Sequence, residues 1–208
     1  MTAELASQDF QLILSSPILS YQEGMSFFKG EGLMNKSLQQ LAADLNRKNI
    51  KYAVIGGIAL NQHGYQRFTQ DIDILLTKEG LQSFEDNLVG LGYVPAFLGA
   101  KKKFRTTEEN VPVEIITTGE FPGDGKEKPV VFPDPSSDGV AIEISGINTL
   151  TLNKLIELKL ASGMTGAGRR KDLADVQELI KIKGLKRELG DELMQYVRAM
   201  YFELWDEI

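Results

Sequence analysis

Two short stretches decide the fold: Tyr52-Ala-Val-Ile-Gly-Gly57 and Gln70-Asp-Ile-Asp-Ile-Leu-Leu76. The first is an apolar, β-prone run that ends in two glycines, and a helix is expected to follow it over about residues 58–63. The second alternates polar and apolar residues, which is typical of a strand with one buried face. Asp71 and Asp73 would then share one face of that strand, because side chains two residues apart point the same way.

The paired carboxylates are a candidate metal site. Asp71 and Asp73 would repel each other unless a cation lay between them, and hard divalent ions such as Mg²⁺ prefer oxygen ligands. A solvated polar strand face is the alternative. Gly56 and Gly57 lie where a strand meets a helix, so a phosphate could approach backbone N–H groups there. A turn needed only for tight packing is the alternative, and the G-x-G-x-x-G spacing of dinucleotide-binding folds is absent.

The composition limits the chemistry. The chain has 208 residues, of which 42% are hydrophobic and 25% charged, as in an ordinary globular protein of one domain with a helical appendage. It contains no cysteine and one histidine. Disulfides, zinc–thiolate sites and cysteine nucleophiles are therefore excluded, and most histidine-based schemes are removed. Carboxylates, lysines, arginines and the backbone are left to carry any reaction.

The net charge of −6 is unevenly spread. Residues 188–208 hold six acids against one base, so most of the acidic excess lies at the C-terminus. A global attraction to nucleic acid is disfavoured, but the cluster Lys101-Lys102-Lys103-Phe104-Arg105 is a candidate patch for nucleic acid or nucleotide, with a solvated strand end or hairpin as the default. No signal peptide and no apolar run of roughly 18 residues is found, which predicts a cytoplasmic protein without a membrane partner.

The pattern along the chain changes near residue 150. Strands and helices alternate before it, and only helices are expected after it. Further strands are expected over residues 111–117 and 140–144, helices over 10–14, 35–49, 78–91, 151–161, 171–183 and 187–205, and loops over 24–32 and 119–139. An α/β (α+β) fold with a helical C-terminal part follows.

The spacing of Gly56-Gly57, Arg67-Phe-Thr69 and Asp71-Ile-Asp73 resembles the nucleotidyltransferase superfamily with the DNA polymerase beta-like fold. In that superfamily a third carboxylate comes from a later strand, and Glu114, within Val113-Glu114-Ile115-Ile116, matches this position. Many members have aspartate there. The longer glutamate is a departure that could change the metal geometry or weaken the activity.

A second similarity lies in the C-terminal part. Leu155-Ile-Glu-Leu-Lys159-Leu-Ala and Arg170-Lys-Asp172-Leu-Ala-Asp175 are similar to the AbiEii-like nucleotidyltransferases, which include toxins of type IV toxin–antitoxin systems. The resemblance spans about residues 37–182. It implies a small mixed nucleotidyltransferase sheet flanked by helices. The expected divisions are an N-terminal extension (1–34), a catalytic domain (35–150) and a helical part packed on it (151–208).

The resemblance also implies roles for the site residues. Asp71, Asp73 and Glu114 would hold one or two Mg²⁺ ions, and Glu114 would deprotonate or orient the acceptor. Gly56 and Gly57 would contact the β- and γ-phosphates of an NTP through their backbone.

Basic residues would complete the nucleotide site. Arg67 would add positive charge to the triphosphate or clamp the aspartates, with an exposed surface arginine as the alternative. Lys159 shares a helix face with apolar residues, which is costly unless its ammonium reaches an anion such as a phosphate; extension along its own stem to solvent is the alternative. Asp172 is placed near the site by the resemblance, although an acid in a first helical turn often only complements the helix dipole. Asp175 is expected at the surface, and His63 is expected to be structural.

Together these features predict a Mg²⁺-dependent nucleotidyltransferase that moves a nucleoside monophosphate from an NTP to an acceptor hydroxyl. The acceptor is open between RNA, a protein and a small molecule such as an antibiotic. A toxin role with an antitoxin partner is implied by the resemblance alone. The alternatives are a catalytically weak nucleotide-binding or protein-interaction module that retains the fold, and a non-enzymatic module that uses the acidic C-terminal helix.

Overall fold

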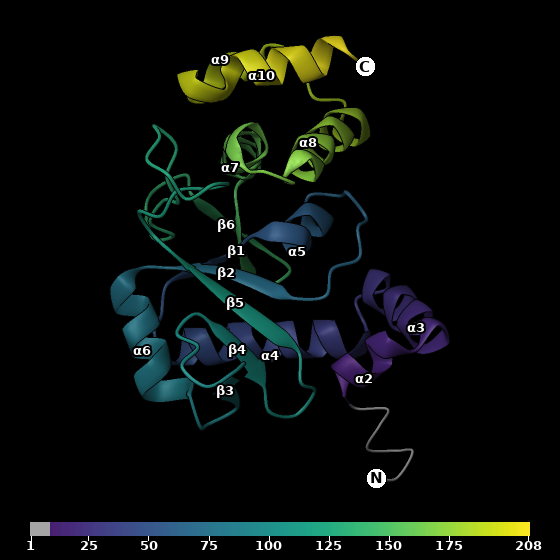
Figure 1. The fold of residues 1–208 in the computed structure, drawn as a ribbon, viewed down its shortest axis with the longest axis vertical. Coiled ribbons are helices and arrows are strands. Elements are labelled where there is room, and N and C mark those ends of the chain that lie inside the picture. Colours follow the sequence, from purple (N-terminus) through teal and green to yellow (C-terminus); the bar gives the residue numbers. More distant parts are fainter. Residues whose placement is uncertain (1–8) are drawn as a thin grey trace.

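The computed structural model describes residues 9–208. Its helices are α2 (Phe10–Ser15), α3 (Pro17–Phe28), α4 (Gly32–Arg47), α5 (Gly56–Gln62), α6 (Lys78–Leu88), α7 (Leu152–Thr165), α8 (Arg170–Lys183), α9 (Leu189–Glu192) and α10 (Gln195–Asp206). Its strands are β1 (Tyr52–Val54), β2 (Ile72–Leu76), β3 (Tyr93–Pro95), β4 (Lys103–Thr106), β5 (Pro112–Thr117), β6 (Ala141–Ile144) and β7 (Ile147–Leu150). The sheet lies in the middle of the molecule, with the C-terminal helices on one side and α4 and α6 on the other (Figure 1).

The strands form one mixed sheet in the order β3-β4-β5-β2-β1-β7-β6. The pairs β2–β5 and β1–β7 are parallel, whereas the remaining neighbours are antiparallel. The mixed α/β fold class is therefore confirmed. The central strand β2 contacts β5 in parallel, which brings two segments about 40 residues apart in the chain side by side in register.

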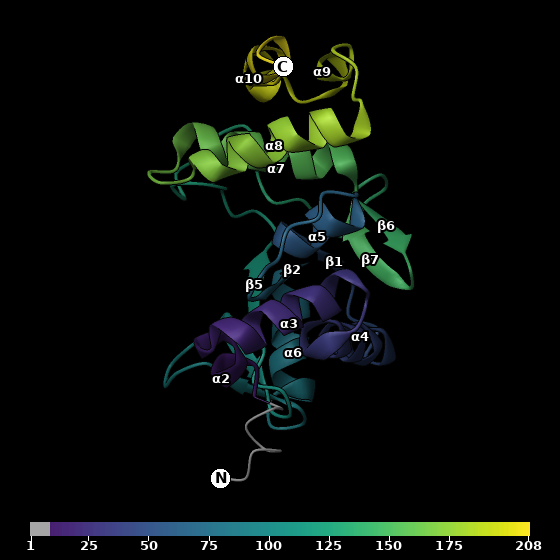
Figure 2. The same cartoon turned by 90° about the vertical axis from the view of Figure 1, so that its right-hand side faces the viewer.

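Each face of the sheet has its own core. On one face, Ile72, Ile74 and Val113 pack with side chains of α4 and α6, among them Leu41 and Phe84. On the other face, apolar residues of β1 and β2 pack against α5, α7 and α8 (Figure 2). Successive side chains of β2 point alternately toward the two faces, because side chains alternate along a strand.

The C-terminal helices continue the second core. Helices α7 and α8 pack against each other, and α9 and α10 lie over them at the end of the molecule (Figure 2). Tyr201 and Val197 of α10 are fully buried in the same cluster as Leu155 of α7 and Ala53 of β1. No described helix is long and apolar enough to cross a bilayer.

Two expectations about elements were wrong, and some strands were missed. The loop expected over residues 24–32 is largely helical, because α3 begins at Pro17, whose ring suits the first turn, and continues through Gly24 to Phe28. The helix expected over residues 187–205 is broken between α9 and α10, where Leu193 adopts an extended backbone and is completely buried. The strands β3 and β7 were not predicted, whereas β4 falls within the strand end or hairpin expected at residues 101–105.

Candidate active site

Two neighbouring strands bring three carboxylates together. Asp71 comes directly before β2, Asp73 lies within it, and Glu114 lies in β5. The parallel register pairs Asp73 with Glu114, and residues opposite each other in a register share a face of the sheet. One oxygen from each of the three carboxylates lies within 4.8 Å of the other two. The side chains thus converge as a shared cation would require.

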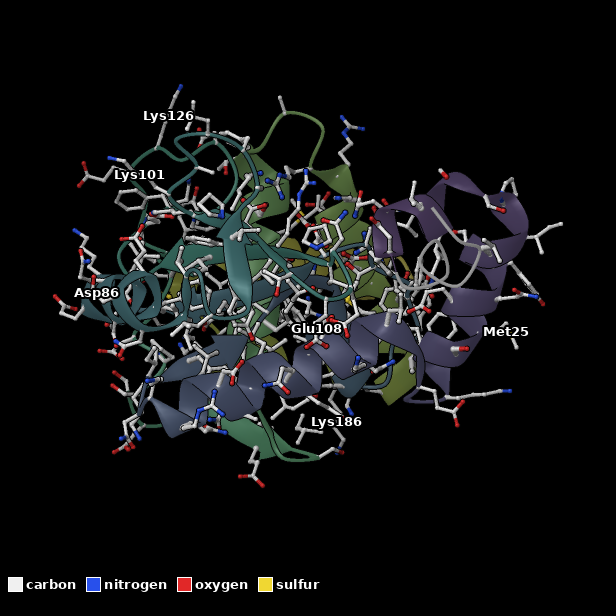
Figure 3. All side chains as sticks on the ribbon, turned by 90° about the horizontal axis from the view of Figure 1, so that it is seen from below. Met25, Asp86, Lys101, Glu108, Lys126 and Lys186 are labelled. Carbon is white, nitrogen blue, oxygen red and sulfur yellow. The ribbon has the colours of Figure 1, made fainter. Side chains whose placement is uncertain are left out.

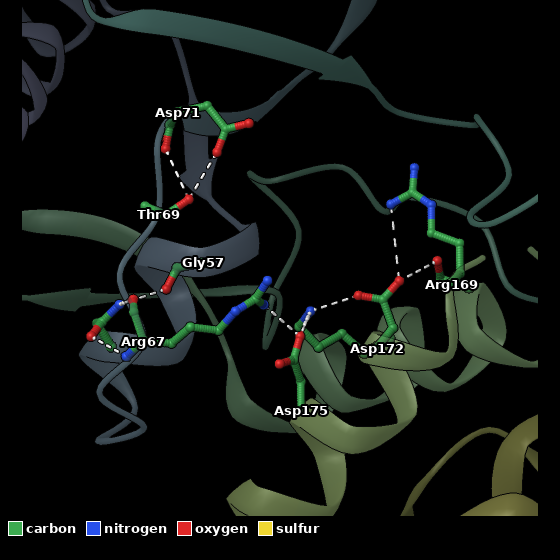
Figure 4. Close-up of polar contacts among 10 residues, drawn as sticks. Gly57, Arg67, Thr69, Asp71, Arg169, Asp172 and Asp175 are labelled. Carbon is green, nitrogen blue, oxygen red and sulfur yellow. Dashed lines mark hydrogen bonds and ion pairs between the residues drawn. The ribbon is translucent and has the colours of Figure 1, made fainter. Parts of the chain in front are cut away.

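The carboxylates are only partly compensated by the protein. Asp71 accepts a hydrogen bond of 2.8 Å from Thr69 Oγ1 (Figure 4), and Glu114 Oε2 lies 3.1 Å from Lys103 Nζ. Burial, followed by the charges of Asp71 and Glu114, raises the pKa of Asp73 from 3.8 to about 7. A set of carboxylate oxygens with this excess of negative charge fits a hard divalent cation such as Mg²⁺.

The glycine pair fits closely against these strands. Gly56 has a positive φ of 64°, and a Cβ there would overlap the carboxylate of Asp73. A Cβ at Gly57 would lie 2.7 Å from the Cβ of Thr69. Tight packing is thus one clear reason for both glycines. Both also line the cavity described below, so their backbone is accessible from it.

Helices α7 and α8 supply a second cluster of charged groups. Lys159 Nζ donates hydrogen bonds to Asp172 Oδ1 at 2.9 Å and Asp175 Oδ2 at 2.7 Å. Arg67 Nη1, from the loop after α5, donates to the same Asp175 oxygen at 2.7 Å (Figure 4). Lys159 is only 8% exposed, so extension to solvent is wrong for this residue.

Two further expectations change with this cluster. Asp175 was expected at the surface, and this is wrong: it is 4% exposed and lies between two cations. Arg67 is neither a free surface arginine nor a clamp on the metal-site aspartates, because its partner is Asp175. Sequence spacing could not reveal this pairing, since Arg67 and Asp175 are 108 positions apart.

Asp172 remains ionised in its buried position. Burial alone would raise the pKa of Asp172, but the charge of Lys159 and the hydrogen bonds from Lys159 and Ser162 outweigh burial and lower it. Ser162 Oγ donates to Asp172 Oδ2 at 2.8 Å, and Arg169 Nη1 lies 3.9 Å from the same oxygen. The carboxylate therefore holds the side chain of Lys159 in place through the 2.9 Å hydrogen bond.

The carboxylates and the charged cluster face one cavity of about 490 Å³. All eight predicted site residues line it: Gly56, Gly57, Arg67, Asp71, Asp73, Glu114, Lys159 and Asp172. Thr69, Ser162 and Arg169 also line it and were not predicted as site residues. An apolar wall is formed by Ile116, Phe132, Leu155 and Leu158. The cavity has the size of a small-molecule site, with acidic, basic and apolar sides.

A folded loop closes one side of the cavity. Phe121, Pro122 and Gly123 lie on its wall, within the loop expected over residues 119–139. Lys128 holds this loop together: its Nζ donates to Pro122 O and Asp124 Oδ1, both at 2.7 Å. A Cβ at Gly123 would lie 2.9 Å from the carbonyl oxygen of Ser162, so the loop packs tightly on α7.

Two features singled out in the sequence lie outside the cavity. The basic cluster at Lys101–Arg105 forms β4 and the turn before it, in agreement with the hairpin interpretation. His63 is buried, with Nε2 2.8 Å from the carbonyl oxygen of Leu150, and burial lowers its pKa. It is a structural residue, as expected.

Comparison with known proteins supports the fold. No protein-family model and no curated protein sequence matches the chain. The solution structure of the antibiotic-resistance factor ANT(2'')-Ia matches 82% of this chain and 95% of its own, with a TM-score of 0.51 and 14% identity. The crystal structure of ANT(2'')-Ia in complex with adenylyl-2''-tobramycin matches 83% of this chain and 97% of its own, with a TM-score of 0.50 and 14% identity. The chain therefore shares the overall fold of ANT(2'')-Ia.

Proposed function

We propose that this chain is a metal-dependent nucleotidyltransferase of the DNA polymerase beta-like superfamily, which moves a nucleoside monophosphate from an NTP to an acceptor hydroxyl. The observation that carries this proposal is the convergence of three carboxylates in a cavity that Lys159 and Arg67 also line. The fold supports it, because it is shared with a protein crystallised with adenylyl-2''-tobramycin.

The acidic side of the cavity would bind metal. Asp71, Asp73 and Glu114 would hold one or two Mg²⁺ ions through their oxygens. When bound, Mg²⁺ would supply positive charge that neutralises the triphosphate and makes the acceptor hydroxyl more acidic. Burial and the charges of Asp71 and Glu114 raise the pKa of Asp73, so a positive charge at this position would be favourable.

The basic side would bind the triphosphate. An ammonium group has three N–H donors, and Lys159 uses two of them on Asp172 and Asp175. The third is available to a phosphate oxygen in the cavity, which Lys159 lines. Arg67 would add a second charged donor, and the backbone N–H groups of Gly56 and Gly57 lie in a first helical turn, where they lack partners within the helix.

The transfer itself is an in-line displacement. The acceptor oxygen forms a bond to the α-phosphorus while the bond from that phosphorus to the β-phosphate oxygen breaks, and pyrophosphate leaves. Glu114, whose side chain is 40% exposed, would accept the proton of the acceptor hydroxyl and release it to solvent. Lys159 and Arg67 would stabilise the charge that develops on the leaving pyrophosphate.

The narrower assignment, to AbiEii-like enzymes with a toxin role, is a separate part of the proposal. It rests on the two sequence stretches around Lys159 and Asp172. Induced expression of the chain should then arrest growth, and co-expression of a small protein encoded next to it should relieve the arrest. Growth that is unaffected by expression would contradict the toxin role and leave the transfer reaction intact.

Labelled nucleotides test the reaction. The purified chain is incubated with each α-³²P-labelled NTP, Mg²⁺ and a cell lysate, and label is followed into RNA, protein and small-molecule fractions. We expect transfer that is lost with EDTA and lost in an Asp71→Asn plus Asp73→Asn variant. The matched control is Asp86→Asn plus Asp138→Asn, since both of these acids are exposed and lie outside the cavity. Transfer that persists without the paired aspartates would refute the metal-site assignment.

A further inference from the structure

Helices α2 and α3 expose a surface that carries no charge. In the chain as a whole 25% of the residues are charged, but residues 10–28 contain a single charged residue, Glu23. Glu23 is buried, and its carboxylate accepts a hydrogen bond of 3.1 Å from Met34 N. Large apolar side chains are exposed on these two helices: Leu12, Ile18, Leu19, Tyr21, Met25 and Phe28. An exposed apolar patch of this kind typically marks an interaction site.

Part of this patch forms a stripe along α3. Its members follow one another at intervals of three, four and three residues: Ile18, Tyr21, Met25 and Phe28. This spacing places the four side chains on one face of the helix. Glu23 and Phe27 are buried on the opposite face, where α3 packs on α4. The stripe therefore points away from the rest of the chain, and Met25 lies at the periphery of the molecule (Figure 3).

A hollow adjoins the stripe at the C-terminal end of α3. Phe28 lines it together with Leu38 of α4 and Ile58 of α5, and its volume is about 390 Å³. Among the described residues, none that lines this hollow is charged. The uncharged surface thus combines protruding side chains with a recess that has room for an apolar side chain.

We infer that two copies of this chain associate through α3, with the two helices antiparallel across a two-fold axis. The order of intervals reads the same in both directions, so the stripe is its own complement when a second copy is turned end for end. Ile18 of one copy then lies opposite Phe28 of the other, and Tyr21 lies opposite Met25. Such a contact uses the same patch on both copies, and Ile18 enters the hollow beside Phe28 of the second copy.

Charge favours a second copy over a membrane or a charged partner. Two uncharged surfaces come together without burying an unpaired charge, which would be costly. Helices that lie on membranes are typically rich in lysine and arginine, and α3 contains neither. The net charge of −6 would also be repelled by an anionic bilayer. The intervals of three and four residues, in contrast, match the apolar positions of paired helices.

Sedimentation equilibrium of the full chain tests the association. We expect a monomer–dimer equilibrium between about 1 and 100 μM, because a contact through one helix is small. Ile18→Glu plus Tyr21→Glu places carboxylates in the contact and should raise the dissociation constant of the dimer by about tenfold or more. The matched control is Leu91→Glu plus Leu98→Glu, which adds the same charge at exposed apolar positions and should associate as the wild type does. All four side chains are exposed, so circular dichroism and thermal melting should show that both variants fold normally.

Crosslinking tests the orientation, and it is specific because the chain contains no cysteine of its own. Ile18→Cys is mixed with Phe28→Cys and treated with a short bis-maleimide. We expect a crosslinked dimer in the mixture and none in either variant alone, because equivalent residues of the two antiparallel helices would be about 15 Å apart along the axis. Leu98→Cys mixed with Phe28→Cys is the control and should give no product. A crosslink in Ile18→Cys alone would contradict the antiparallel pairing and overturn the inference.

The inference goes beyond the proposed function and can fail separately from it. The Asp71→Asn plus Asp73→Asn variant should associate as the wild type does, whether or not the wild type transfers a nucleotide. A wild type that stays monomeric at the highest concentration would overturn the inference, as would equal weakening in the stripe variant and its control. Binding of a monomeric wild type to phosphatidylglycerol vesicles, lost in the stripe variant, would overturn it in favour of a membrane surface.

Discussion

Asp73 is held at a high pKa by its surroundings, and this has a cost for the folded protein. Its pKa is about 7 in the folded chain against an ordinary value of 3.8. Between these values the folded chain binds more protons than the unfolded chain, so this group makes stability fall as pH rises from about 4 to about 7. Mg²⁺ binding would remove the penalty, and protons would compete with it below about pH 7.

An Asp73→Asn substitution should therefore stabilise the metal-free protein at pH 8. We expect a gain of about 1–3 kcal/mol in the free energy of unfolding that disappears near pH 4, because asparagine carries no charge at either pH. Urea denaturation in EDTA at several pH values measures this. Asp138→Asn, at an exposed position, serves as the control. Equal free energies of unfolding for the wild type and the variant at pH 8 would contradict the proposed repulsion between the carboxylates.

Asp175 holds both cations of the basic side, so its removal should affect binding and stability together. Asp175→Asn leaves Lys159 and Arg67 short of negative charge in a buried position, and we expect a loss of about 2–4 kcal/mol of stability and a raised KM for the NTP. Thermal melting and steady-state kinetics measure the two effects.

A double-mutant cycle measures the interaction between Arg67 and Asp175 separately from their other contacts. Arg67→Gln in the Asp175→Asn background should cost less than it does alone, because the two side chains act on each other. Additive losses would show that the hydrogen bond between them contributes little.

At the scale of single residues, the sequence allowed prediction of those site residues that stand in a recognisable local pattern. Asp71 and Asp73 are two positions apart, and Lys159 is conspicuous as a lysine among apolar neighbours. Asp175 has no such pattern, because its importance comes from Arg67, which only the folded chain brings close. The eight predicted residues all line one cavity, but residues that position them, such as Asp175, were not predicted as site residues.

At the scale of elements, α5 is a short helix whose first residue is fixed by a neighbouring strand. Gly56 has a positive φ and lies against the Asp73 carboxylate, whereas Gly64, with a φ of 97°, has open space where a Cβ would point. Substitution of either glycine would therefore strain the backbone, but only a side chain at Gly56 would also collide with a neighbouring residue.

Gly56→Ala and Gly64→Ala form a matched pair. Both should lose about 1 kcal/mol of stability from the positive φ. Only Gly56→Ala should also displace Asp73 and abolish metal-dependent transfer. Isothermal titration with Mn²⁺ and the labelled-nucleotide assay measure the difference. Similar activities in the two variants would show that the close contact at Gly56 does not control the carboxylate.

The elements that sequence patterns missed are short or depend on neighbours. β3 has three residues and β7 has four, too few for a period of two to stand out. α3 contains Gly24, a residue typical of turns, but α3 is fixed by tertiary contacts: Phe27 packs on Phe68, and the buried Glu23 accepts a hydrogen bond from Met34 N at the start of α4. Long or strongly alternating elements such as β2, β5 and α7 were predicted correctly: β2 and β5 differ from the prediction only at their first residues, and α7 continues beyond its predicted end to Thr165.

At the scale of the whole molecule, the site is shared between the sheet and the C-terminal helices. The carboxylates belong to β2 and β5, whereas Lys159 and its partners belong to α7 and α8. One apolar core joins these parts, because Ala53 and Leu75 of the sheet lie in the same cluster as Tyr201 of α10. The geometry of the cavity depends on this shared core, and so the parts should unfold together.

The single tryptophan makes this testable. Trp205 lies in α10, and its Nε1 donates to Leu185 O at 2.9 Å, so its fluorescence reports on the C-terminal end of the molecule. Leu41→Ala removes a buried side chain of α4, on the far face of the sheet, and should cost about 2–4 kcal/mol. We expect the urea transitions followed by Trp205 fluorescence and by circular dichroism to coincide and to shift equally, since a cooperative unit transmits a loss of stability throughout. Leu98→Ala, at a fully exposed position, should shift neither. A fluorescence transition that stays in place in Leu41→Ala would mean that the helical part folds independently and that the two sides of the cavity are joined only weakly.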